Sequence, residues 1–193
     1  MINNLELEEK SDEELVLVIL DNQNAFSYIV ERYKNKLLRY IRRISSVGLE
    51  DAEDILQNIF IKVYLNLNEF DHSLKFSSWI YRIAHNEIID NYRKKKSRPQ
   101  LIDIDINDSH IKELAGETNI MEELSREELK REISLAIDKL DLKFQEIIIL
   151  KYIEEKDYQE ISDIIKKPLG TVASRMNKAR TELKKIMFDK KTI

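Results

Sequence analysis

Helical periodicity, combined with a scarcity of residues that break helices, most constrains the fold of this chain. Only three glycines and two prolines occur among 193 residues, and 35% of the residues are charged. Apolar residues recur every three or four positions through most of the sequence, as they do on the buried face of an amphipathic helix. This pattern predicts an all-α fold with few tight turns.

The composition also excludes several classes of site. The chain has no cysteine, which excludes disulfides, thiol nucleophiles and cysteine zinc sites and is compatible with a reducing cytosol. The N-terminus, MINNLELEEKSDEEL, is acidic and lacks the basic and then apolar pattern of a signal peptide. No apolar run approaches the roughly 20 residues that span a bilayer. We therefore expect a soluble, cytoplasmic protein.

The periodicity is interrupted once, which divides the chain. It dissolves from Ser97 to about Asn119 and resumes near Met121. Pro99 blocks continuation of a helix, and LIDIDI alternates like a strand without a neighbouring strand signal, so we interpret this interval as an extended acidic linker. The prediction is two small helical domains joined by a flexible linker, the second ending in a helix-turn-helix. The predicted parts are 1–20 (N-terminal extension and first helix), 21–97 (first domain), 98–122 (linker) and 123–190 (second domain).

Local signals mark the helices of the first part of the chain. Ser11 followed by Glu14 predicts a capping box at the start of the first helix. The acidic stretch before it is expected to be solvated and partly disordered. Further helices are predicted from about Asn24 to Ser45, from Asp51 to about Leu67 after a break at Gly48, and from Phe76 or Ser77 to Lys96.

The formal net charge of −4 conceals a strong segregation of charge. Two basic clusters lie on either side of an acidic interval. The first cluster contains Arg93, Lys94, Lys95, Lys96 and Arg98; the second contains Lys166, Lys167, Arg175, Lys178, Arg180, Lys184 and Lys185; the interval contains Asp103, Asp105, Asp108, Glu113, Glu117, Glu122 and Glu123. Because phosphate binding depends on local potential, an acidic total does not exclude nucleic acid as a partner.

The predicted helix from Asp51 to Leu67 has a core face and an unusual second face. Its core arc consists of Ala52, Ile55, Leu56, Ile59, Phe60, Val63 and Leu67. The opposite arc holds Asp51, Asp54, Gln57, Asn58 and Lys62, and also Ile61 and Leu65. Either another helix of the same domain covers these two aliphatic residues, or they form the apolar centre of a protein-docking face with a polar, negative rim.

The helix that begins at Phe76 combines a buried arc with a stripe suited to nucleic acid. The buried arc is Phe76, Ile80, Ile83, Ala84 and Ile88, and the stripe is Trp79, Arg82, Asn86, Ile89 and Arg93, continued by the basic run to Lys96. Arginine binds phosphate, asparagine can bond a base edge, and tryptophan can stack on an unstacked base. Trp79 alone is more typical of a core aromatic, and the basic run also suits a solvated helix end. The stripe and the cluster together favour DNA binding.

A helix-turn-helix is predicted from Asp157 to Lys185. Asp157 and Glu160 form a capping box, and Pro168 and Gly170 suit the first position of the next helix and a close backbone approach. The inward residues are Tyr158, Ile161, Ile164, Ile165, Val172, Met176, Ala179 and Leu183, and the outward ones are Ala173, Ser174, Asn177, Lys178, Thr181, Lys184 and Lys185. This layout is typical of a recognition helix, although the same unit also occurs without DNA.

Three segments in this order resemble the bacterial sigma-70 family. DAEDILQNIFIKVYLNL, FSSWIYRIAHNEIIDNYRKKK and YQEISDIIKKPLGTVASRMNKAR resemble its regions 2.2, 2.3–2.4 and 4.2, and the resemblance extends from about Asn22 to Met187. The chain resembles the extracytoplasmic-function (ECF) group in particular, because it is short and has no segment similar to regions 1.1 and 3. The resemblance implies a sigma factor that binds RNA polymerase core, recognises the −35 and −10 promoter elements and opens the DNA.

The resemblance also implies roles for particular residues. Docking on the clamp coiled coil of the polymerase β′ subunit is implied for Asp51, Asp54, Ile55, Gln57, Asn58, Phe60, Ile61 and Leu65. Binding and melting of the −10 element, with a flipped base held by the loop before Trp79, is implied for Lys75, Phe76, Ser77, Trp79, Arg82, Asn86, Arg93, Lys94, Lys95 and Lys96. Reading of the −35 element is implied for Tyr158, Gln159, Thr171, Ala173, Ser174, Arg175, Asn177, Lys178 and Arg180.

Further partners follow from the same resemblance. It implies that the linker threads through polymerase channels, that the second domain rests on the β flap, and that an anti-sigma factor masks both domains. Asn58 stands where the family often has an acidic residue, Ala173 where it often has Lys or Arg, and Asn177 where an aromatic or basic residue is common. These departures leave the −35 preference open.

No catalytic constellation is present in the sequence, so we expect no enzyme activity, no metal and no cofactor. The three histidines are scattered, and a glycine-rich phosphate loop is absent. Two other functions compete with the sigma factor hypothesis. A conventional helix-turn-helix regulator would explain the second domain but neither the face with Ile61 and Leu65 nor the Trp79 stripe. A protein–protein adaptor is disfavoured by the two basic clusters.

Overall fold

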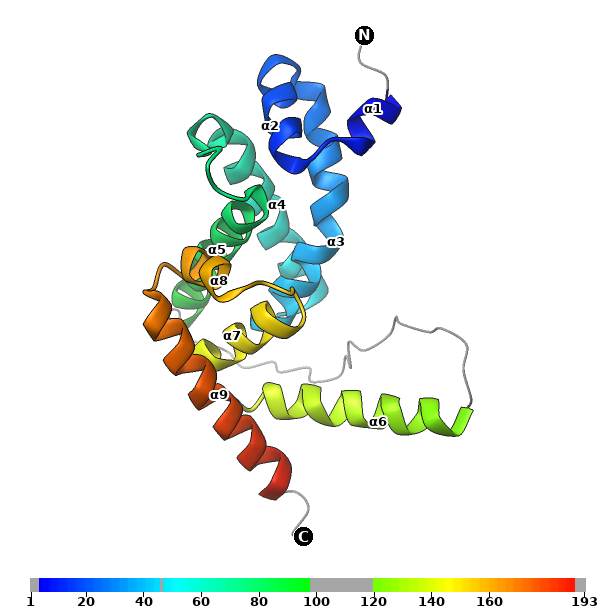
Figure 1. The fold of residues 1–193 in the computed structure, drawn as a ribbon, viewed down its shortest axis with the longest axis vertical. Helices are drawn as coiled ribbons and strands as arrows, with labels where there is room; N and C mark the ends of the chain where they lie inside the picture. The colour runs from blue at the N-terminus through cyan, green and yellow to red at the C-terminus, as the bar shows by residue number, and fades with distance from the viewer. Residues whose placement is uncertain (1–3, 46, 98–119, 190–193) are drawn as a thin grey trace.

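The computed structural model describes residues 4–45, 47–97 and 120–189, and all regular structure in them is helical (Figure 1). The α-helices are α1 (Asn4–Glu9), α2 (Asp12–Asp21), α3 (Phe26–Ser45), α4 (Leu49–Leu65), α5 (Phe76–Ser97), α6 (Ile120–Ile137), α7 (Leu142–Tyr152), α8 (Tyr158–Ile165) and α9 (Leu169–Asp189). Short 3-10 turns occur at η1 (Gln23–Ala25) and η2 (Leu67–Glu69). The predicted all-α class is confirmed, whereas most of the predicted linker lies outside the described residues.

Both predicted capping boxes are present. The Ser11 hydroxyl accepts from Glu14 N at 3.2 Å, and the Glu14 carboxylate accepts from Ser11 N at 2.7 Å. At the start of α8, the Asp157 carboxylate accepts from Glu160 N at 2.8 Å, and the Glu160 carboxylate accepts from Asp157 N at 2.9 Å. Each box satisfies two backbone N–H groups that a helix start leaves without an intrahelical partner.

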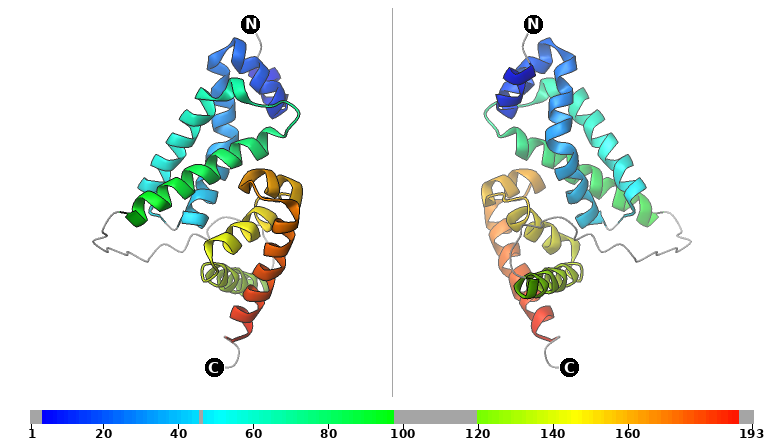
Figure 2. Two further views of the ribbon diagram at one scale, coloured as in Figure 1. Left: turned by 90° about the vertical axis from the view of Figure 1, so that its left-hand side faces the viewer. Right: turned by 90° about the vertical axis from the view of Figure 1, so that its right-hand side faces the viewer.

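Helices α2 to α5 pack around one core in the upper lobe of the molecule (Figure 2). The core contains buried residues of the inward arcs predicted for α4 and α5, such as Ile55, Ile59 and Ile80. Its largest fully buried side chains in this lobe are Leu15, Ile29, Leu37, Tyr40, Ile41, Ile55, Ile59, Phe76, Ile80 and Ile88. Burial of such apolar surface is the main contribution to the stability of this lobe.

Helix α1 corrects the expectation of a partly disordered lead-in for residues 4–9. Leu7 is buried, and Arg32 of α3 donates from Nη2 to the carbonyl oxygens of Leu7 at 3.3 Å and Glu8 at 2.7 Å. These carbonyls lie at the end of a helix, where they lack an intrahelical partner, so the guanidinium holds α1 against the first lobe.

Helices α6 to α9 form a second lobe. Seven consecutive residues of α7, from Phe144 to Leu150, are buried. A helix that is buried all round requires neighbours on every side, and α7 contacts α8 and α9 of its own lobe and α3 of the first. Helix α9 buries Val172, Met176 and Ala179 completely, as predicted, while α6 extends away from the body of the molecule (Figure 1).

The two lobes contact each other directly. Helix α8 packs along α5, and α7 packs on α3, so that the second lobe covers one side of the first (Figures 1 and 2). Within the described ranges, no helix combines the length and apolar character needed to cross a membrane.

Candidate functional site

The outward face of α4 presents apolar side chains to solvent. Ile61 is 49% exposed and Leu65 is 70% exposed, and Asp54, Gln57 and Asn58 beside them are also exposed. The inward face is buried through Ala52, Ile55, Ile59 and Val63. The alternative that another helix covers Ile61 and Leu65 is therefore wrong for the described part of the chain.

Two residues predicted to dock on polymerase lie on the inward side of α4. Ile55 is only 1% exposed, because it belongs to the core of the first lobe. Phe60 is half-buried, and its ring meets the edge of Phe26 with a centroid separation of 6.4 Å. The structure corrects the prediction that Ile55 contacts polymerase. Its side chain packs in the core beneath the outward face of α4 and has no exposed surface for a partner.

The loop before α5 has a defined shape. The Asp71 carboxylate accepts from Ser73 N at 2.9 Å, and the Asp71 carbonyl accepts from Leu74 N at 2.9 Å. The hydrogen bond from Ser73 N lowers the pKa of the Asp71 carboxyl from its usual value. At the start of α5, Phe76 N donates to Oε1 of Glu13 at 2.7 Å. Residues of the loop are thus anchored both locally and by α2.

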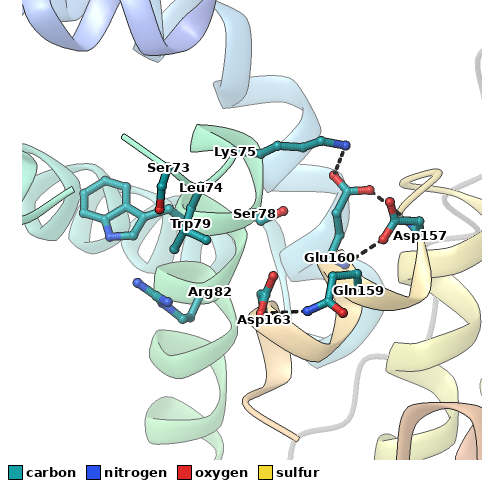
Figure 3. Close-up of a pocket in the computed structure, with 10 residues that line it drawn as sticks. All are labelled: Ser73, Leu74, Lys75, Ser78, Trp79, Arg82, Asp157, Gln159, Glu160 and Asp163. Atoms are coloured by element: carbon teal, nitrogen blue, oxygen red, sulfur yellow. Dashed lines mark hydrogen bonds and ion pairs between the residues drawn. The ribbon is translucent and has the colours of Figure 1, made fainter. Parts of the chain in front are cut away.

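A cavity of about 220 Å³ opens between this loop and α8 (Figure 3). One wall belongs to the first lobe and the other to α8. The lining residues are Ser73, Leu74, Lys75, Ser78, Trp79 and Arg82 from the first lobe, and Asp157, Gln159, Glu160 and Asp163 from the second. The first wall carries cations and the second carries carboxylates, so the second lobe gives a negative side to a cavity at the predicted −10 site.

Two aromatic residues of the predicted −10 site are core residues. Trp79 is 5% exposed and lies with ring centroids 5.5 Å from Phe70 and 5.6 Å from Phe76, which is fully buried. Burial of an indole among aromatic rings stabilises the lobe, which confirms the core interpretation of Trp79. The structure corrects the prediction of a DNA contact for Phe76, because its side chain has no exposed surface.

The polar members of the predicted −10 site are accessible. Asn86, Arg93 and Lys94 are exposed, Ser77 and Arg82 are half-buried, and the Lys75 side chain is 65% exposed. Arg93 Nη1 lies 4.0 Å from Asp90 on the surface, a pair too exposed to hold the guanidinium strongly. The side chains of Lys95 and Lys96 lie outside what the structure describes.

The turn of the helix-turn-helix differs in detail from the prediction. The αL residue is Lys166, with φ of 52°, and the Ser162 hydroxyl donates to the Lys167 carbonyl at 2.6 Å. Pro168 lies one position before the first helical residue, because its carbonyl accepts the first i→i−4 bond, from Val172 N at 3.1 Å. A Cβ at Gly170 would meet no atom within 4 Å, so none of the described segments approaches this glycine closely.

The predicted −35 residues lie together on α8 and α9. Gln159, Ser174, Asn177, Lys178 and Arg180 are exposed, and Tyr158, Thr171, Ala173 and Arg175 are half-buried. Arg180 is held in place, since its Nε donates to the Tyr152 hydroxyl at 2.9 Å and its guanidinium lies 5.7 Å from the Tyr152 ring centroid. The predicted set thus forms one accessible surface with a fixed basic member.

Sequence reasoning missed a group of polar residues where the lobes meet: Tyr40, Arg43, Tyr81, His85, Glu146, Glu154 and Lys156. The only signal was Gln145 and Glu146 inside the otherwise apolar run FQEIIIL, and both are buried. A buried carboxylate must find partners, yet no local pattern identifies partners that lie more than sixty residues away.

Comparisons with known proteins agree with this geometry. The chain matches the family described as sigma-70 region 2 over residues 29–98 and the family described as sigma-70 region 4 over residues 130–183. It is 36% identical over 173 residues to the ECF RNA polymerase sigma factor SigW of Bacillus subtilis (87% of this chain, 91% of the relative). It is 33% identical over 166 residues to the ECF RNA polymerase sigma-E factor of Escherichia coli K12 (82% and 84%).

Solved structures share the fold. The chain resembles CnrH, solved with the cytosolic domain of CnrY, with a TM-score of 0.67 and 24% identity over 93% of this chain and 99% of that one. It also resembles the sigma factor RpoE of Bartonella quintana, solved with the anti-sigma factor NepR, with a TM-score of 0.63 and 21% identity over 84% and 96%. The chain therefore belongs to the extracytoplasmic-function group of sigma-70-family factors, and is an RNA polymerase sigma factor that directs promoter-specific transcription initiation.

Proposed function

We propose that this sigma factor docks on the β′ clamp coiled coil of RNA polymerase through the outward face of α4. The observation that carries the proposal is the exposure of Ile61 and Leu65, at 49% and 70%, among the exposed polar residues Asp54, Gln57 and Asn58. An apolar centre with a polar rim is the usual anatomy of a protein interface. A regulator that binds duplex DNA without polymerase would have no use for this face.

The two DNA sites divide the work of promoter recognition. The exposed polar residues of α8 and α9 read the −35 element in a major groove, while Arg82, Asn86, Arg93 and the loop at 71–75 bind the −10 strand. The second domain also rests on the β flap. RNA synthesis itself is polymerase chemistry, so this chain supplies recognition and strand opening and needs no cofactor. The chain acts in the cytoplasm, where polymerase and promoters are located.

The test is transcription in vitro from a selected promoter library with purified core polymerase. The wild-type chain should produce promoter-specific initiation, and Asp54→Lys should abolish it by preventing core binding while circular dichroism shows an unchanged helical content. The absence of specific initiation from any promoter with the wild-type chain would overturn the proposed function. Unchanged core affinity in Asp54→Lys would move the docking site away from α4.

An anti-sigma factor is the expected regulator of this chain. The supporting observation is that RpoE of Bartonella quintana, which shares this fold, was solved with the anti-sigma factor NepR. Purification of the tagged chain from its native cells under non-inducing conditions should recover a stoichiometric protein partner that blocks initiation in the transcription assay. Recovery of the chain alone, fully active, would contradict this part of the proposal.

A further inference from the structure

An exposed tyrosine at the end of α7 holds an arginine of the predicted −35 surface. Arg180 of α9 donates from Nε to the Tyr152 hydroxyl at 2.9 Å, and its guanidinium carbon lies 5.7 Å from the centroid of the Tyr152 ring. Tyr152 is 54% exposed, and Arg180 is exposed as well. Tyr152 belongs to none of the binding sites described above, so its contact with Arg180 has no function assigned to it.

The pair stands on backbone that the fold fixes. Tyr152 is the last residue of α7. The end of this helix is closed by hydrogen bonds from Ile153 N to the Ile149 carbonyl and from Lys156 N to the Leu150 carbonyl, each at 2.9 Å. Helix α7 also packs directly on α9. The tyrosine and the arginine therefore extend from two helices whose relative position is set by the packing of the second lobe.

The contact contributes little to the stability of the fold. Both side chains lie on the surface, and a cation–π contact at an exposed site is weak. Its main consequence is for Arg180, a long side chain that would otherwise sample many rotamers in water. A side chain that is ordered before DNA binds loses less conformational entropy in the complex. The contact therefore favours binding more than folding.

The hydrogen bond uses the inner nitrogen of the guanidinium. Donation from Nε of Arg180 to the Tyr152 hydroxyl leaves the N–H groups of both terminal nitrogens, Nη1 and Nη2, for a different acceptor. Two parallel N–H donors match two oxygens of one phosphate group. Tyr152 thus orients the guanidinium without occupying the edge that suits a phosphate.

Arg180 lies where the wall of a DNA groove is expected. Residues three or four positions apart share a helix face, so Ala173, Asn177 and Arg180 form one row along α9. Arg180 is seven positions beyond Ala173, or about 10 Å at a rise of about 1.5 Å per residue. The major groove is about 12 Å wide, so Arg180 is placed to reach backbone phosphates when the start of α9 faces base edges. Ala173 and Asn177 carry no charge, which makes Arg180 the first cation of this row.

We propose that Tyr152 is a positioning residue for −35 recognition: it holds the Arg180 guanidinium in the orientation in which both terminal nitrogens bind one backbone phosphate. The proposal rests on the −35 site proposed above and adds to it a residue outside the helix-turn-helix. Arg180 supplies the charge and the contact, and Tyr152 supplies the orientation. Because a phosphate carries no sequence information, the pair strengthens binding to every −35 sequence alike.

A double-mutant cycle in reconstituted holoenzyme tests this coupling. Tyr152→Ala should weaken promoter binding about tenfold, and Tyr152→Phe, which keeps the ring, about threefold. In the Arg180→Ala background, either change should have little further effect, because the side chain that Tyr152 orients is absent. Tyr92→Phe and Tyr92→Ala are the matched controls. Tyr92 is 49% exposed on α5, and both of its variants should bind the promoter as the wild type does.

Two further readouts separate positioning from a structural role. Arg180→Ala should reduce the salt dependence of promoter binding by about one phosphate contact, and Tyr152→Ala by a smaller amount. Both variants should weaken binding to promoters with different −35 sequences by the same factor, and neither should shift the thermal unfolding midpoint of the chain. Additive losses in the cycle, a changed preference among −35 sequences, or a lowered unfolding midpoint in Tyr152→Ala would overturn the proposal.

NMR of the free chain tests the geometry without polymerase or DNA. The Nε–H proton of Arg180 should exchange slowly with water in the wild type and faster in Tyr152→Phe, and an unchanged rate would overturn the proposal. Failure of the proposed function would look different, since the wild-type holoenzyme would then initiate at no specific promoter. Failure of the positioning role alone would leave wild-type initiation intact and make the Tyr152 variants equal to the Tyr92 controls.

Discussion

At the scale of single residues, Glu13 connects the acidic N-terminal segment to the −10 site. Its Oε1 accepts from Phe76 N at 2.7 Å, one of the N–H groups at the start of α5 that have no intrahelical acceptor. A carboxylate at this position also interacts favourably with the helix dipole. The neighbouring Asp12 bonds Arg32 at 2.8 Å, so α2 is held on α3 while it holds α5. We infer that Glu13 positions the loop at 71–75.

Glu13→Ala is expected to lower strand opening at the −10 element about tenfold, because it removes a charge-assisted hydrogen bond to the helix start. Glu13→Gln should restore part of the loss, since its amide oxygen can still accept from Phe76 N. The measurement is fluorescence of a base analogue placed in the −10 strand of a polymerase complex. Asp21→Ala, at the exposed end of α2, is the control. Equal defects in the Gln and Ala variants would contradict a positioning role. So would a loss of affinity for core polymerase as large as the loss of strand opening.

At the scale of elements, α4 and α2 offer a matched comparison. Ile61→Ser with Leu65→Ser removes apolar surface from the docking face, whereas Leu17→Ser with Leu20→Ser removes it from α2, where these residues are 55% and 44% exposed. In the proposed complex, Ile61 and Leu65 are buried against polymerase. Loss of these two aliphatic contacts should therefore weaken core binding by at least about tenfold. The α2 variant should bind core polymerase as the wild type does in a fluorescence titration. Equal effects of the two double variants would indicate that the substitutions destabilise the fold, and would contradict a docking role for the α4 face.

The N-terminus of α8 offers a second comparison of this kind. Asp157 caps its helix with a side-chain hydrogen bond, whereas Asp141 occupies the same position of α7 without one. Asp157→Ala should therefore destabilise α8 by about 1 kcal/mol, and Asp141→Ala by clearly less. Amide hydrogen exchange of α8 and α7 in the full chain measures both. Equal loss of protection in the two variants would contradict the role of the capping box.

The cost of Asp157→Ala should depend on pH. The hydrogen bond from Glu160 N lowers the pKa of the Asp157 carboxyl from its usual value of 3.8. A carboxyl with a lowered pKa in the folded state stabilises that state above its unfolded pKa, and this contribution is lost as the pH falls through the folded pKa. The difference in α8 protection between wild type and Asp157→Ala should therefore shrink below about pH 4. A difference that stays constant down to pH 2 or so would contradict this assignment.

Elements were predictable where their signals are local. The two capping boxes and the inward faces of α4 and α9 depend on residues within a few positions of each other, and the structure contains them. The N-terminal segment was misjudged because its anchor, Arg32, lies more than twenty residues away. The exposure of Ile61 and Leu65 could not be decided from one helix, since it depends on what the rest of the chain leaves uncovered.

At the scale of the whole molecule, the packing of one lobe on the other could not be predicted. Periodicity identifies apolar faces, but it gives no signal for the partners that Glu146 and Glu154 find in the first lobe. Glu146 pairs with Tyr40 across 106 positions of sequence, and Tyr81 with Glu154 across 73. The charge segregation seen in the sequence did indicate that this acidic chain could bind DNA locally, but not that carboxylates of the second lobe line a cavity beside the predicted −10 site.

The packing of the two lobes should respond to alkaline pH through Tyr40 and Tyr81, whose hydroxyls donate to Glu146 and Glu154 of the second lobe. Burial, followed by the nearby carboxylates, raises the pKa of both Tyr40 and Tyr81 well above the usual value of 10.0. A group whose pKa is raised in one state stabilises that state fully below its usual pKa, and the contribution is lost as the pH rises. The groups that face Tyr40 are Glu146, Glu154 and Tyr81, and those that face Tyr81 are Glu154, Arg39, Arg43 and, over its ring, Lys156.

The population with packed lobes should therefore fall as the pH rises above 10.0. Spin labels at Asn68→Cys and Glu182→Cys, exposed positions on the first and the second lobe, report it through the distance between them in pulsed electron paramagnetic resonance. In the Glu146→Ala and Glu154→Ala double variant, Tyr40 and Tyr81 should ionise at lower pH than in the wild type, as followed by NMR of ring-labelled tyrosine. Tyr33 is an internal control, because its pKa is raised by burial and by Asp12 within the first lobe. A parallel change at Tyr33 would indicate unfolding of the first lobe. No change at Tyr40 or Tyr81 would show that the carboxylates of the second lobe do not raise the pKa of these tyrosines.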